Sequence, residues 1–182
     1  MPTTIHSIIT KYGLIAVDDV QDERHLLVNE RLQGKALLSE PCIPTSLYMV
    51  EIINKVKQLK EVTKALVFGG GAFLIPSQLN FSSIETDVVE HNPEMLKVAK
   101  EYFDYDSEGK VFIRSALEQI KVIKRDEYDL IIVDLFNGHE SPSWLEPFVN
   151  KCCQLVKHVI VNRIVDGSNR LQYYYCTDEA VK

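Results

Sequence analysis

The sequence lacks the features that characterise membrane, secreted and metal-binding proteins. None of its apolar runs approaches the roughly 18 residues that a helix needs to cross a bilayer, and the amino terminus MPTTIHSIITKYG has no charged-then-apolar signal pattern. Its four cysteines, Cys42, Cys152, Cys153 and Cys176, form no CxxC pair and have no histidine at metal-ligand spacing. We therefore expect a cytoplasmic protein with reduced, buried thiols, no metal and no membrane partner.

The sequence is also short of positive charge. It has 20 Lys and Arg against 26 Asp and Glu, which gives a formal net charge of -6. Nucleic acids and anionic membranes attract proteins that carry a surplus of Lys and Arg on at least one face. We expect neither as a partner and favour a small molecule or another protein.

Residues 1–43 predict a small N-terminal β subdomain. The segments SIITKYGLIAV and HLLVNERLQGKALL are rich in β-branched and aliphatic residues, which favour strands. The polar stretch DDVQDER lies between them, and Asn29 with Glu30 indicates a second turn. This pattern predicts an antiparallel sheet of two or three strands.

Residues 44–182 predict an α/β domain. After two prolines, Met49, Ile52, Ile53, Val56 and Leu59 recur on one face of a helix. From residue 64 short apolar strands alternate with helical segments, which is typical of parallel β-α-β units in a doubly wound, Rossmann-like fold with a mainly parallel sheet. The successive segments are KALVFGG, LIPSQLN, ETDVVEH, PEMLKVAKEYF, KVFIRSA, LEQIKVIK, YDLIIVDLF, SWLEPFVNKCCQLVK, HVIVNRI and LQYYYCT.

Ligands of such sheets bind beyond the carboxyl ends of the strands, where this chain has a glycine turn and an acidic residue. Gly69, Gly70 and Gly71 follow the first strand, and Glu90 ends the next strand 19 residues later. A glycine turn brings backbone close to a ligand, and an acidic residue at this spacing accepts hydrogen bonds from ribose hydroxyls. A tight structural turn and a solvated carboxylate are the alternative interpretations.

Two further strand ends carry polar residues. Ser115 and Ala116 follow FIR, where they would border a nucleoside base or simply form a structural loop. Asp134 ends the apolar strand YDLIIVD, and its carboxylate is a candidate general base.

The ordered set of these features resembles the spermidine synthase family and its relatives among the class I S-adenosylmethionine-dependent methyltransferases. Glu90 in VVEHNPEMLKVAKEYF is similar to the family's acidic ribose ligand, and YDLIIVDLFNGHESP to the strand that delivers its catalytic aspartate. The amino-terminal part is similar to the family's small β domain, with Gln33 and Tyr48 at positions that border the substrate pocket. The resemblance spans about residues 7 to 165. It implies S-adenosylmethionine or its decarboxylated form as co-substrate, and Asp134 as the catalytic residue.

The chain departs from the family where polyamine synthesis needs acids. Aminopropyltransferases carry an acidic residue at the position of Ala72, an acid near Ser115 and a second aspartate at the position of Asn137, which lies on the acceptor side. A dicationic amine needs a partner for each charge once it leaves water. The resemblance therefore favours methyl transfer to a small acceptor over aminopropyl transfer.

A third hypothesis is a non-catalytic protein that binds a nucleoside or a partner. In that case Phe73, in the bulky segment AFLIP, would fill the space of the methionine moiety. The tyrosine run 173–175 indicates either an edge strand or the interface of a homodimer.

Overall fold

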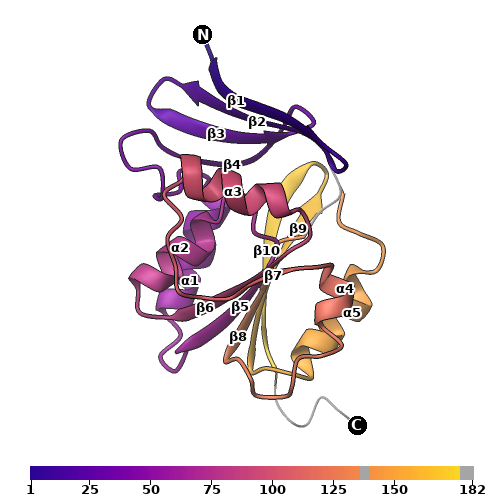
Figure 1. The fold of residues 1–182 in the computed structure, drawn as a ribbon. Helices are drawn as coiled ribbons and strands as arrows, with labels where there is room; N and C mark the ends of the chain where they lie inside the picture. The colour runs from indigo at the N-terminus through magenta and orange to yellow at the C-terminus, as the bar shows by residue number, and fades with distance from the viewer. Residues whose placement is uncertain (136–139, 177–182) are drawn as a thin grey trace.

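The structure is a computed structural model that describes residues 1–135 and 140–176. It contains two sheets, a small antiparallel one formed by the amino-terminal residues and a larger, mostly parallel one flanked by helices (Figure 1). The predicted Rossmann-like α/β fold with a separate small β sheet is confirmed.

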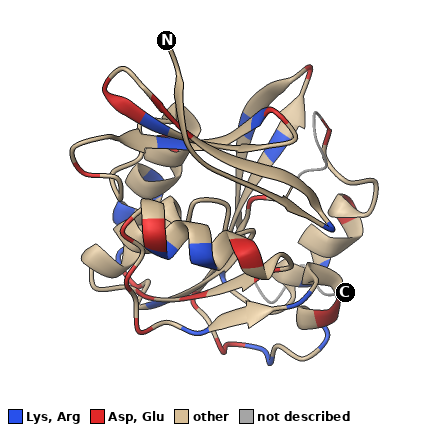
Figure 2. Cartoon of the chain, turned by 45° about the horizontal axis from the view of Figure 1, so that its top comes forward, with Lys and Arg blue, Asp and Glu red and all other residues tan. Residues whose placement is uncertain are grey.

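The small sheet has four strands in the order β1-β2-β3-β4, so the prediction of two or three strands is wrong. The strands are β1 (Thr3–Thr10), β2 (Gly13–Val20), β3 (Glu23–Val28) and β4 (Arg31–Leu37). The stretch DDVQDER is a hairpin rather than an interruption, because its polar side chains pair across strands. The Arg24 guanidinium bonds both oxygens of Asp19 at 2.8 and 3.0 Å, and Lys35 bonds Glu23 at 2.9 Å. Figure 2 shows acidic and basic segments interleaved over this sheet.

The large sheet has the strand order β10-β9-β8-β5-β6-β7. Strands β5 (Lys64–Phe68), β6 (Glu85–Glu90), β7 (Val111–Ile113), β8 (Leu130–Val133) and β9 (His158–Val165) are parallel, and β10 (Ser168–Tyr175) is an antiparallel edge strand. The chain order reverses between β5 and β8. Ligands of doubly wound sheets bind beside this reversal, beyond the carboxyl ends of the strands.

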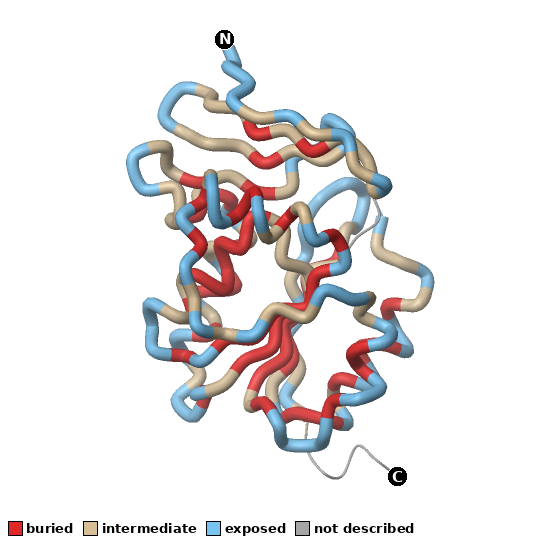
Figure 3. Tube along the Cα trace, viewed as in Figure 1, coloured by how far each residue is buried: buried red, intermediate tan, exposed pale blue. Residues whose placement is uncertain are grey.

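Helices cover both faces of the large sheet (Figure 1). One face packs against α1 (Leu47–Lys57), α2 (Leu74–Phe81) and α3 (Pro93–Tyr102), and the other against α4 (Ala116–Gln119) and α5 (Leu145–Cys153). Side chains of β5 alternate between the two cores, with Val67 in the first and Phe68 in the second. Because both faces are covered, the central strands β5 and β8 are almost entirely apolar and appear as buried segments in Figure 3.

The small sheet shares the core of the first face. Ile15, Val17 and Leu26 are fully buried and belong to the cluster that includes Met49 and Ile52 of α1. A second connection is polar, because Arg24 donates a hydrogen bond of 3.0 Å to the Tyr102 carbonyl at the end of α3. The small sheet therefore lies over the helices beside the carboxyl ends of β5 and β6.

The turn between β5 and α2 combines left-handed backbone with close packing. Gly69 and Gly71 have φ angles of +95° and +52°. A Cβ atom on Gly69 would collide with the backbone carbonyl of Asp134, whereas one on Gly71 would meet no atom within 4 Å. The two glycines therefore have different structural roles. Gly69 permits the close approach of β5 to β8, whereas Gly71 is required only for its left-handed backbone conformation.

We expect Gly69→Ala to lower the free energy of unfolding by about 3 kcal/mol or more, and Gly71→Ala by about 1 kcal/mol. Both substitutions introduce left-handed strain, but only the first adds a collision with backbone that cannot move independently. Urea unfolding of the two variants measures the difference. Equal losses would contradict the packing role of Gly69.

Candidate functional site

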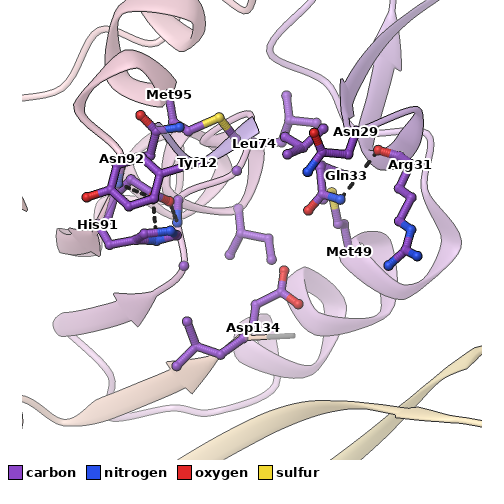
Figure 4. A pocket seen from close by; sticks show the side chains of 17 residues that line it. Tyr12, Asn29, Arg31, Gln33, Met49, Leu74, His91, Asn92, Met95 and Asp134 are labelled. Carbon is purple, nitrogen blue, oxygen red and sulfur yellow. Dashed lines mark hydrogen bonds and ion pairs between the residues drawn. The ribbon is translucent and has the colours of Figure 1, made fainter. Parts of the chain in front are cut away.

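A pocket of about 410 Å³ lies beyond the carboxyl ends of β5, β6 and β8, at the position where the chain order reverses. Its walls come from the glycine turn, from the segment after β6 and from the small sheet (Figure 4). A volume of this size is in the range of small-molecule sites, roughly 300–1,000 Å³.

Glu90 forms one end of the pocket and is held by backbone. Its Oε2 accepts a hydrogen bond of 3.0 Å from the Gly70 amide, and its Oε1 accepts one of 2.8 Å from the Asn92 amide. Asn92 is in turn the cap of α3, because its side chain accepts from the Glu94 amide and Pro93 follows it. The helix start and the strand end thus fix one carboxylate between them.

The charge on Glu90 is stabilised in spite of burial. The side chain is only 5% exposed, which by itself raises the pKa of a carboxyl group. Hydrogen bonds from His91, Asn92 and Gly70 outweigh this effect and lower the pKa of Glu90. His91 lies 3.1 Å from Oε1, and this interaction raises the pKa of the imidazole. Glu90 is therefore an ionised acceptor of hydrogen bonds.

Asp134, at the end of β8, carries the second carboxylate of the pocket. Its Oδ1 accepts a hydrogen bond of 2.8 Å from the side-chain Nδ2 of Asn162, and its Oδ2 accepts one of 3.3 Å from the Tyr48 hydroxyl. Burial raises the pKa of Asp134 to about 6, although both hydrogen bonds act in the opposite direction. Burial and the neighbouring carboxylate raise the pKa of Tyr48. A carboxyl group whose pKa is about 6, such as that of Asp134, can gain and lose a proton near neutral pH.

The pocket brings together most of the residues singled out from the sequence. Gly69, Gly70, Gly71, Glu90, Asp134 and Gln33 line it. Tyr48 lies behind this lining and contacts it through Asp134 and through a bond of 3.4 Å to the Gln33 carbonyl. Asn137 lies outside the described residues.

Ser115 and Ala116 are not among the residues that line the pocket. The Ser115 hydroxyl accepts a bond of 3.2 Å from the Glu118 amide, and the Glu118 carboxylate bonds back to the Ser115 amide. This reciprocal pair is a capping box that starts α4. The structure therefore supports the loop interpretation of Ser115, whose polar groups serve the helix.

Several pocket residues went unrecognised in the sequence. Tyr12, Asn29 and Arg31 come from turns and strand ends of the small sheet, and His91 and Met95 from the segment after β6. Asn162 is fully buried on β9 and reaches Asp134 from the neighbouring strand. A polar residue inside the apolar strand HVIVNRI is the one signal that pointed to it, because a buried amide needs partners.

Phe73 does not fill the pocket. Its side chain is fully buried in the first core and contacts the Tyr105 ring, with 4.6 Å between ring centroids. A Cβ on Gly70 would collide with the Phe73 ring, so the phenylalanine supports the glycine turn from the core side. The inward packing of Phe73 counts against the hypothesis that AFLIP fills the site, although Leu74 and Ile75 of this segment line the pocket.

Residues 1–135 and 140–176 contain neither a metal-binding cluster nor a membrane-spanning helix. No group of three or more His, Cys, Asp or Glu side chains is arranged to hold a metal ion there. No helix in this part of the chain is long and apolar enough to span a bilayer.

Sequence comparison gives no relative, since no family model and no curated protein matches the chain. Similar solved structures include a probable spermidine synthase from Corynebacterium glutamicum, with a TM-score of 0.73 and 18% identity over 90% of this chain. Spermidine synthase from Thermotoga maritima has a TM-score of 0.67 and 17% identity over 87% of this chain. Human methyltransferase-like protein 13, in complex with SAH, has a TM-score of 0.56 and 19% identity over 74% of this chain and 82% of its own length.

The chain spans 64% and 56% of the lengths of the two spermidine synthases. At these identities the similarity is one of fold, and it includes both spermidine synthases and S-adenosylmethionine-dependent methyltransferases. The chain has the spermidine-synthase-like class I methyltransferase fold.

Proposed function

We propose that the protein binds S-adenosylmethionine or a related nucleoside and transfers the methyl group to a small acceptor. The observation that carries this proposal is the pocket itself, which places an ionised carboxylate, a glycine turn and a second carboxylate of raised pKa around one cavity. The fold is shared with transferases of this kind, which supports the same function.

Glu90 is suited to the ribose of such a donor. Its Oε2 accepts one hydrogen bond, from the Gly70 amide, and keeps a lone pair for a further donor, whereas Oε1 already contacts the Asn92 amide and His91. Because the lowered pKa keeps the carboxylate ionised, Oε2 is suited to accept a charge-assisted hydrogen bond from a ribose hydroxyl group. His91, Asn92 and Met95 line the same end of the pocket and would border the base.

Asp134 is suited to the acceptor. When bound, an S-adenosyl donor supplies a methyl carbon attached to a cationic sulfur. Gly69–Gly71 let the donor approach the backbone, and the pocket aligns the acceptor with that carbon. As the acceptor forms its bond to carbon, the carbon–sulfur electron pair goes to sulfur and the acceptor's proton goes to Asp134.

Aminopropyl transfer is the second candidate, because the two spermidine synthases have higher TM-scores than human methyltransferase-like protein 13. The charges of the pocket argue against it. Of the described lining residues only Glu90 and Asp134 are acidic, and Glu90 is already bound to backbone and His91. Ala72 is buried in the core where those enzymes carry an acid. A diamine would therefore have too few carboxylate partners.

We expect Glu90→Gln to weaken binding of S-adenosylmethionine and methylthioadenosine by at least about tenfold. The amide keeps the shape of the side chain but loses its charge and presents an NH2 group to one hydroxyl. Calorimetric titration measures both affinities. Glu85→Gln is the matched control, because Glu85 lies at the opposite end of β6 and pairs with Lys64 at the surface.

Unchanged affinity of the Glu90→Gln protein would contradict the ribose role. Absence of binding to the unsubstituted protein would exclude the proposed function itself and leave the hypothesis of a non-catalytic protein that binds a partner.

We expect Asp134→Asn to stabilise the folded protein at pH 7.5 by about 1–2 kcal/mol. Burial raises the folded-state pKa from 3.8 to about 6, so the folded state holds a proton that the unfolded state has lost between these pH values. Stability attributable to Asp134 therefore falls as pH rises from about 4 to 6 and stays low above 6. A rise of the pKa from 3.8 to about 6 sets a limit of roughly 3 kcal/mol on this effect, and partial contact of Asp134 with solvent reduces it.

Urea unfolding of both proteins at pH 4 and pH 7.5 tests this effect. The difference between them should be small at pH 4, where Asp134 is protonated in the folded state. A difference that does not change with pH would show that Asp134 is not a buried titrating group.

A further inference from the structure

Arg31 is the one Lys or Arg side chain among the described residues that line the pocket. It begins β4, and its side chain is exposed. None of the hydrogen bonds and ion pairs found among the described residues occupies its guanidinium group, whereas its backbone pairs with Val28 of β3 and its carbonyl accepts from the Gln33 side chain at 3.4 Å. Two other cations of the small sheet are paired, Arg24 with Asp19 and Lys35 with Glu23. An unpaired guanidinium beside a ligand pocket is available to an anionic group of the ligand.

Two neutral donors accompany Arg31. Asn29 and Gln33 flank it along the hairpin and line the same pocket, and Figure 4 shows the three side chains together on one side of the cavity. The Asn29 Oδ1 accepts a bond of 2.9 Å from the Leu14 amide, which fixes the orientation of the carboxamide and leaves its NH2 group as a donor. A guanidinium and two carboxamides are groups that bind a carboxylate.

This group of donors lies across the pocket from the residues around Glu90. Figure 4 shows Tyr12, His91, Asn92 and Met95 on the opposite side, with Asp134 between the two sides. A donor whose ribose is held by Glu90 and whose sulfur lies near Gly69–Gly71 extends its remaining chain toward β4. The amino-acid end of S-adenosylmethionine, which carries the molecule's carboxylate, would then meet Arg31.

We propose that Arg31, with Asn29 and Gln33, binds the carboxylate of the donor's amino-acid end and selects S-adenosylmethionine over its decarboxylated form. This inference rests on the proposed function and specifies its substrate. The decarboxylated donor presents only an ammonium group at this end, which the guanidinium repels. The selection explains why this pocket serves methyl transfer, since aminopropyl transfer needs the decarboxylated molecule.

We expect the unsubstituted protein to bind S-adenosylmethionine about tenfold more tightly than the decarboxylated donor, as is typical for loss of one charge-assisted contact. Arg31→Met should remove this preference by weakening S-adenosylmethionine about tenfold. Arg31→Glu should reverse it, because the new carboxylate attracts the ammonium group. Calorimetric titrations with the two donors and with methylthioadenosine, which lacks the amino-acid end, measure these changes.

Methylthioadenosine separates this inference from the proposed function. Its affinity should be the same in all three proteins, because it does not reach Arg31. Arg170→Met is the matched control, since Arg170 is an exposed arginine of β10 that does not line the pocket. Thermal unfolding of each variant checks that the fold is unchanged.

Equal affinity of the unsubstituted protein for the two donors would overturn the inference, as would an Arg31→Met protein that keeps the preference. In both cases retained binding of methylthioadenosine would leave the nucleoside site intact. Failure of all three ligands to bind the unsubstituted protein would overturn the proposed function together with the inference.

Discussion

The close approach of the Gly69 backbone to the Asp134 carbonyl is the constraint on which the site depends. It holds the ends of β5 and β8 together at the position where the order of the parallel strands reverses. The same turn directs the Gly70 amide to Glu90 of β6. Three strand ends thus meet around one turn, and a side chain on Gly69 would separate them. Phe73 completes this arrangement from the core, where its ring packs against Gly70.

The two carboxylates of the pocket differ because their surroundings differ. Glu90 receives two backbone hydrogen bonds and a histidine, and these lower its pKa in spite of burial. Asp134 receives two side-chain hydrogen bonds that do not offset its burial, and its pKa rises to about 6. The surroundings of Glu90 therefore favour its charged form, and those of Asp134 favour its protonated form. A pair of acids with opposite shifts is typical of sites that combine binding with chemistry.

On the proposal made above, the small sheet contributes to the choice of donor rather than to the reaction. It shares the first core with α1, which places its hairpins over the pocket, and Asn29, Arg31 and Gln33 come from one of them. The fold is common to proteins that use different donors and acceptors, so the difference between them has to lie in such side chains. Among the described residues that line the pocket, one unpaired guanidinium stands beside two acidic side chains, and this balance is the basis of the proposed preference for a donor that carries a carboxylate.

Much of the fold was predictable from local patterns, because strand and helix periodicity and the spacing from the glycine turn to Glu90 are properties of neighbouring residues. The four strands of the small sheet were not, since the pairing of Arg24 with Asp19 turns an apparently polar break into a hairpin. Ser115 was ambiguous for a similar reason, because its hydroxyl serves either a ligand or a helix cap and only the structure shows the cap. By itself, the sequence determined the Rossmann-like class and the strand ends that carry Glu90 and Asp134. Tertiary structure decided that Phe73 packs inward, that Asn162 and Tyr48 hold Asp134, and that Arg31 reaches the pocket, because these contacts join residues far apart in the chain.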